Sequence, residues 1–208
     1  MKPILVLYAT REGHTRRIAE HIGELIRMRG QQVRLLDAAT VAEPIELGAY
    51  AAAVLAASVH GGAHEREIVR FVKAHRAELE RLPAAFISVS LTEAGAEDRE
   101  KTAAQRAEAS QQVGQMIQKF FDQTGWHPAL VKPVAGALLY TQYGRLLRFI
   151  MKRIVAHQAG VTDTTRDYEY TDWPSIDRFV DEFMLQTLPA ALGPTAAPAP
   201  PERTGEYR

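Results

Sequence analysis

The sequence contains no cysteine. Without thiols the chain cannot form disulfides, use a thiolate nucleophile, or hold zinc or an iron–sulfur cluster through cysteine. The absence of cysteine also fits a reducing compartment. The formal net charge is zero, because the 25 basic and 25 acidic side chains balance each other. No overall field therefore attracts the chain to nucleic acid or a membrane, and we expect no nucleic-acid partner.

Long apolar runs are absent too. The N-terminal run Ile4–Tyr8 is too short for a signal peptide, and no stretch reaches the roughly 20 apolar residues that cross a bilayer. The 208 residues are 46% apolar and 24% charged, which is typical of one soluble, well-cored domain. We therefore expect a cytoplasmic protein, with any membrane contact limited to the inner face of the cell membrane.

Apolar runs of strand length alternate with amphipathic segments. The expected strands are Ile4–Tyr8, Val33–Leu36, Tyr50–Ala57, Ala85–Leu91 and a fifth around Leu130–Leu139, in which Pro133 marks an edge or a bulge. The first expected helix follows the first strand and ends at Gly30, and the second covers 68–79. A polar loop that starts at Glu93 leads into a third helix, which ends near Phe121. The last helix, Trp173–Leu188, closes the fold.

This order predicts a doubly wound, five-stranded parallel sheet with helices on both faces, in one domain over residues 1–188. The stretch 139–172 is longer than such a fold needs between its last strand and last helix. Residues 189–208 are rich in proline and alanine and predict a disordered tail.

A short polar loop separates the first expected strand from the first expected helix. Ligands of doubly wound sheets bind outside the carboxyl ends of the strands, and free N–H groups at a helix N-terminus favour phosphate. The loop has neither the Gly-Lys-Ser/Thr ending of a P-loop nor the glycines of a dinucleotide fingerprint. Either it binds a phosphate, or its first threonine only caps the helix. Its residues are Thr10, Arg11, Glu12, Gly13, His14 and Thr15.

This loop resembles the phosphate loop of flavodoxins, Thr/Ser-x-Thr-Gly-x-Thr, with Glu12 in place of the third hydroxyl residue. An acidic residue before the glycine is typical of the small bacterial FMN- and menaquinone-dependent protoporphyrinogen oxidases, a flavodoxin-like family. The resemblance covers most of residues 3–187 and is most specific at Tyr170-Thr171-Asp172-Trp173. It also includes Ala57–Val59, Phe71–Lys73, Pro83–Leu91, Gly136–Leu138, Tyr140, Arg148–Lys152 and Thr162–Thr164.

The resemblance implies that FMN phosphate lies on Thr10–Thr15 and that the isoalloxazine lies between the loops after the third and fourth strands. At Gly61 the chain lacks the aromatic residue that relatives carry, so either FMN binding differs or Trp126, Tyr140 or Tyr143 covers the flavin. The implied cofactor-binding residues of the two loops are Ser58, Val59, His60, Gly61, Gly62, Ser88, Val89, Ser90, Leu91 and Thr92.

Two histidines, His60 and His64, follow the third strand. Together with Glu65 they offer metal-ligand atoms, but no third distant ligand is evident, and we predict no metal site. His60 is either a polar neighbour of the flavin edge or a solvated loop histidine. By position alone it is our candidate catalytic residue.

The stretch between Asp122 and Asp163 contains no acidic residue. A helix over 143–157 would place its basic residues on one side and leucine, isoleucine and methionine on the other. This helix either packs on the core or lies on an anionic membrane surface, where it would also suit an apolar substrate with carboxylates. Its basic residues are Arg145, Arg148, Lys152 and Arg153.

The resemblance implies FMN-dependent oxidation of protoporphyrinogen IX to protoporphyrin IX in heme biosynthesis, with menaquinone or ubiquinone as the electron acceptor. A flavodoxin-type electron carrier, an FMN-dependent quinone reductase and a protein that has lost FMN remain as alternatives.

Overall fold

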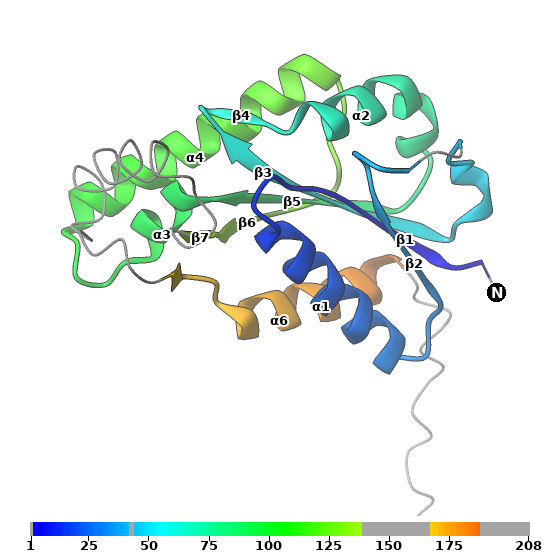
Figure 1. Ribbon diagram of the computed structural model, residues 1–208, viewed down its shortest axis with the longest axis horizontal. Helices are drawn as coiled ribbons and strands as arrows, with labels where there is room; N and C mark the ends of the chain where they lie inside the picture. The colour runs from blue at the N-terminus through cyan, green and yellow to red at the C-terminus, as the bar shows by residue number, and fades with distance from the viewer. Residues whose placement is uncertain (1, 42–43, 139–166, 188–208) are drawn as a thin grey trace, which may run out of the picture.

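The computed structural model describes residues 2–41, 44–138 and 167–187. Its centre is a parallel sheet (Figure 1). The strands are β1 (Ile4–Ala9), β2 (Val33–Asp37), β3 (Ala52–His60), β5 (Ala84–Ser90) and β6 (Leu130–Ala135), in the spatial order β2-β1-β3-β5-β6. The short β4 (Ala63–His64) pairs antiparallel with the end of β3. The prediction of five parallel strands is confirmed.

Helices cover both faces of the sheet (Figure 1). On one face lie α1 (His14–Met28) and α6 (Trp173–Thr187), and on the other lie α2 (Arg66–Leu79) and α4 (Ala103–Thr124). A single 3-10 turn, η1 (Leu47–Ala49), precedes β3. The strands are apolar on both faces because each face packs against helices. In β1, for example, Val6 faces α1 while Leu5 and Leu7 face α2.

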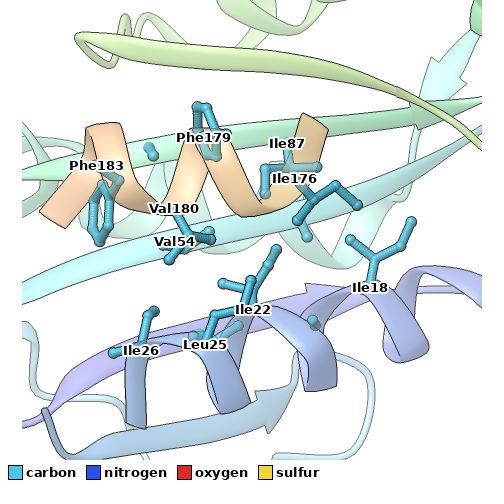
Figure 2. Packing of buried hydrophobic residues seen from close by; sticks show 14 of the residues in the cluster. Ile18, Ile22, Leu25, Ile26, Val54, Ile87, Ile176, Phe179, Val180 and Phe183 are labelled. Carbon is cyan, nitrogen blue, oxygen red and sulfur yellow. The ribbon is translucent and has the colours of Figure 1, made fainter. Parts of the chain in front are cut away.

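Figure 2 shows the core between the sheet and the α1–α6 layer. The α1 positions Ile18, Ile22, Leu25 and Ile26 recur at helical spacing and are buried, as the sequence predicts. They meet the strand residues Val54 and Ile87 and the apolar stripe of α6, which consists of Ile176, Phe179, Val180 and Phe183.

The polar stretch after β5 is more ordered than we predict from the sequence. Instead of a loop from Glu93, it forms α3 (Leu91–Glu97), and α4 then begins at Ala103. Two local caps explain the difference. The Ser90 hydroxyl accepts a hydrogen bond from Glu93 N, and Thr102 with Gln105 forms a capping box.

Two features of the strands also differ from the expectation. Strand β3 runs to His60, so Ser58, Val59 and His60 are strand residues rather than loop residues. Pro133 causes no bulge, because β6 keeps an unbroken register with β5 from Leu130 to Ala135. The strand lies at the edge of the sheet, where a missing N–H is tolerated.

Beyond β6, the strands β7 (Ala137–Leu138) and β8 (Tyr168–Glu169) pair antiparallel and lead into α6. The expected helix over 143–157, Tyr140, Tyr143, the four basic residues from Arg145 to Arg153 and the tail lie outside the described residues. Within the described ranges no helix has the length and apolar character that crossing a bilayer requires.

Candidate functional site

The loop after β1 ends in the N-terminus of α1, as predicted. Thr10 does not cap the helix, because its hydroxyl oxygen accepts a hydrogen bond from Gly13 N at 3.0 Å and so closes the loop upon itself. Gly13 is the residue before the helix, with φ 86°, and no side chain caps the helix. The N–H groups of the first turn are therefore left for a ligand.

This loop fits the phosphate of FMN. Helix α1 has no acidic residue in its first turn, so its dipole is not already compensated there. A Cβ built on Gly13 would meet nothing within 4 Å, which leaves open space beside the main chain. The positive φ of Gly13 also disfavours any other residue.

His14, the first residue of α1, is only 5% exposed. Its Nε2 lies 2.7 Å from the Thr171 hydroxyl oxygen, and that hydroxyl donates to Ala135 O at 2.7 Å. The second ring nitrogen, Nδ1, is buried and has no hydrogen-bond partner among the described residues. Burial lowers the pKa of His14. The carboxylate of Glu169 acts in the opposite direction and raises the pKa, whereas the positive charge of Arg17 lowers it further.

Glu12 and Arg11 of the same loop contact the end of β3 and the start of α2. The Glu12 carboxylate lies 2.9 Å from His60 Nε2, so its charge faces the histidine rather than the helix N-terminus. Arg11 Nε lies 3.1 Å from an oxygen of Glu65. These two contacts bring the predicted phosphate loop and the predicted flavin segment together.

Glu65 is the buried centre of this contact, with a side chain only 5% exposed. The Ser58 hydroxyl donates to it at 3.2 Å, and His60 Nε2 lies 3.4 Å away. A buried carboxylate needs compensating charge and hydrogen bonds, and here Arg11, Ser58 and His60 surround it. At sequence level Glu65 attracts notice only as a weak metal-ligand candidate, because nothing local reveals its partners.

The two histidines of this region have different surroundings. His64 Nε2 lies 2.8 Å from the Ser88 hydroxyl oxygen. The imidazole ring packs edge-to-face with the rings of Phe86 and Phe120, with a centroid distance of 5.1 Å to each. Burial, with Lys119 nearby, lowers the pKa of His64 from 6.5 to about 4. His64 is therefore a neutral core residue, whereas His60 stands at the rim beside Glu12. In the described part of the chain no three metal-ligating side chains converge.

The turn between β3 and β4 is formed by Gly61 and Gly62, both with positive φ. A Cβ on either glycine would meet nothing within 4 Å, so the tip of this hairpin faces open space. The idea that Trp126 covers a flavin here is wrong. Trp126 is fully buried near Phe86 and Phe120, on the α2–α4 face of the sheet.

The end of β5 borders the same edge of the sheet. Ser88 and Val89 point into the two cores, while Leu91 and Thr92 begin α3 rather than a loop. The first turn of α3 contains Glu93, a buried carboxyl that sequence reasoning misses because its stretch reads as a solvated loop. Burial, together with Glu97, raises the pKa of Glu93 to about 7, against the opposing effect of Lys132.

Comparison with known proteins identifies the family of this chain. The family model described as "Flavodoxin domain" matches residues 5–165. The chain therefore belongs to the flavodoxin family. A short-chain flavodoxin associated with a bacterial microcompartment is similar over 90% of this chain and 99% of its own, at 13% identity and a TM-score of 0.49.

Curated relatives narrow the assignment. A protein of Leishmania major named protoporphyrinogen IX dehydrogenase (quinone) is 32% identical over 194 residues, which is 91% of this chain and 77% of the relative. The Escherichia coli K12 protein of the same name is 32% identical over 178 residues, covering 86% of this chain and 92% of the relative. The chain belongs to this family of flavodoxin-like dehydrogenases.

Proposed function

We propose that the protein is an FMN-dependent oxidoreductase that oxidises protoporphyrinogen IX to protoporphyrin IX and passes the electrons to a quinone. The observation that carries this proposal is the 32% identity to the two named dehydrogenases over most of both chains. The flavodoxin family match supports FMN as the cofactor, and so does the N-terminus of α1, which has no capping side chain and no acidic residue in its first turn.

FMN would supply the two-electron chemistry, and the chain would bind and orient it. Its phosphate would lie on Thr10–Thr15, beside the free N–H groups of the first turn of α1. The isoalloxazine would lie near the β3–β4 hairpin and the end of β5. There the glycine tip leaves one side open for a second large ring system, which suits a porphyrinogen.

His60 is our candidate catalytic residue. Oxidation of the porphyrinogen removes six electrons and six protons in three two-electron steps, with one hydrogen lost from each of the four bridging carbons and two lost from pyrrole nitrogens. The His60 side chain is partly exposed beside the hairpin, and its Nε2 is buried, 2.9 Å from Glu12 and 3.4 Å from Glu65. These carboxylates would hold the imidazole in place and stabilise it when it receives a proton.

The quinone would be a membrane quinone, menaquinone or ubiquinone, and the chain would meet it at the inner face of the cell membrane. The basic and apolar residues of 143–157, with Arg145, Arg148, Lys152 and Arg153, support contact with anionic lipid. The domain would span residues 1–188, with 139–172 as an insertion and 189–208 as a tail.

The central test combines a flavin spectrum with a porphyrin assay. Purified protein with FMN should show a bound-flavin spectrum, and it should form fluorescent porphyrin from protoporphyrinogen when a menaquinone analogue is added. Absence of a flavin spectrum would overturn the proposal. Flavin binding without accelerated porphyrin formation would leave an electron carrier or a quinone reductase.

His60→Gln tests the assignment of the histidine, and His75→Gln is its control because His75 lies on α2 and pairs with Glu78. We expect His60→Gln to lower the rate of porphyrin formation tenfold or more while FMN still binds. Equal rates in the two variants would remove His60 from the catalytic role.

Membrane contact is tested by flotation with anionic vesicles. The charge reversal Arg148→Glu/Lys152→Glu should abolish flotation. The matched reversal Arg66→Glu/Arg70→Glu, with the same spacing on the exposed side of α2, should leave it intact. Equal flotation of both variants, or none by wild type, would contradict a basic membrane surface at 143–157.

A further inference from the structure

The buried ring of His14 has one nitrogen with a partner and one without. The Thr171 hydroxyl carries a single hydrogen, and it donates this hydrogen to Ala135 O at 2.7 Å. Toward His14 the hydroxyl can therefore only accept, so His14 Nε2 must carry a hydrogen in the 2.7 Å contact. The protonation state of His14 is thus decided at Nδ1 alone.

Nδ1 is buried and has no hydrogen-bond partner among the described residues. A side chain at the first position of a helix leans toward the N-terminus of the helix. Nδ1 is also the ring nitrogen nearer the main chain, while Nε2 reaches away to Thr171. The unpartnered nitrogen is therefore the one on the main-chain side of the ring, at the first position of the helix whose N-terminal N–H groups we assign to the phosphate.

When the loop holds no ligand, we expect His14 to be neutral. The groups that act on the ring are Arg17 on α1, Glu169 on β8 and the edge of the Trp173 ring on α6 at 6.2 Å. Arg17 and Glu169 form an ion pair with each other at 2.7 Å, so neither supplies a free charge to the imidazole. Burial then dominates, and it lowers the pKa of His14.

A phosphate dianion reverses this balance, because an opposite charge within a few ångströms favours the charged form of a buried group. We propose that His14 takes up a proton when the phosphate of FMN binds to the N-terminus of α1, and that the imidazolium Nδ1–H then donates to this phosphate. His14 thereby becomes a cationic phosphate ligand, which Arg11, committed to Glu65, is not. This inference rests on the proposed FMN site.

The test is a calorimetric titration of FMN-free protein with FMN at pH 7.5, in two buffers with different ionisation enthalpies. At this pH the phosphate of FMN is already almost wholly a dianion, because its second pKa is about 6. Wild type should take up between about half a proton and one proton per FMN. Its affinity for FMN should weaken by up to tenfold per pH unit as the pH rises further.

His14→Gln keeps an N–H that can donate to Thr171 but cannot titrate, and it should take up no proton. The matched control is His21→Gln, since His21 also lies on α1 beside Trp173 but pairs with Asp177. This control should behave as wild type. Riboflavin, which lacks the phosphate, should bind wild type without proton uptake.

The possible results distinguish the role of His14 from the FMN site itself. FMN binding without proton uptake in wild type, or with equal uptake in His14→Gln, would overturn the role of His14 and leave the FMN site intact. A failure of wild type to bind FMN would overturn both.

Discussion

The neutral state of His64 has a measurable consequence for the pH dependence of stability. His64 is hydrogen-bonded to Ser88 and enclosed by Phe86 and Phe120, and its pKa is lowered from 6.5 to about 4. Between these two pH values the unfolded chain binds a proton at His64 that the folded chain does not. The free energy of unfolding should therefore fall as the pH drops below 6.5.

The size of the effect follows from the two pKa values. A lowering by about 2.5, at 1.36 kcal/mol per pKa unit, corresponds to about 3 kcal/mol when the pH is well below 4. At pH 5.0 the same linkage gives about 2 kcal/mol, and at pH 7.5 it is close to zero.

Wild type alone would hide this effect. The pKa of Glu93 is raised from 4.5 to about 7, so the folded chain binds the extra proton at that residue. Glu93 therefore makes the protein more stable as the pH falls from 7 toward 4.5, which opposes His64. The contribution of His64 has to be measured as a difference between variants.

The variant His64→Phe/Ser88→Ala removes both partners of the buried hydrogen bond, so no polar group is left unsatisfied. Urea unfolding of FMN-free protein at pH 7.5 and 5.0 would be compared with wild type and with His75→Gln. From pH 7.5 to pH 5.0, the free energy of unfolding of wild type and of the control should fall by about 2 kcal/mol more than that of the double variant. A difference below about 0.5 kcal/mol would refute the assignment of His64 as a buried neutral residue.

Three further predictions follow from the same structure. Gly13→Ala and Gly30→Ala place a Cβ at positive φ in open space at opposite ends of α1, so both should lower stability by about 1–2 kcal/mol in thermal unfolding. Only Gly13→Ala should weaken FMN binding, tenfold or more by fluorescence titration, and equal binding would argue against the phosphate loop. Glu93→Gln should stabilise the protein at pH 8 but not at pH 4.5 in urea unfolding, since it removes a buried ionised carboxyl, and no gain at pH 8 would contradict the raised pKa. Phe120→Ala should cost about 3–5 kcal/mol because Phe120 is fully buried and stacked on Phe86 at 4.2 Å, whereas the half-buried Phe121→Ala should cost clearly less.

The sequence by itself determined the sheet and the place of the phosphate loop. Continuous apolar runs such as Ile4–Tyr8 have to be covered on both sides, and this requires helices on both faces. The spacing of Ile18, Ile22, Leu25 and Ile26 fixes the buried face of α1 in the same way. Because β1 leads directly into α1, the loop between them lies at the carboxyl edge of the sheet, whatever the rest of the chain does.

Tertiary structure decided what the polar residues of this edge do. Glu12 meets His60, Arg11 meets Glu65, and His14 meets Thr171 across 157 positions of chain. The same packing makes His64 a core residue and His60 a rim residue, although the two are four positions apart. Periodicity and capping report only on neighbours within a few residues, whereas these contacts depend on which strand ends are brought side by side. Burial, which decides the charge of His64 and Glu93, exists only once the sheet and its helices have assembled.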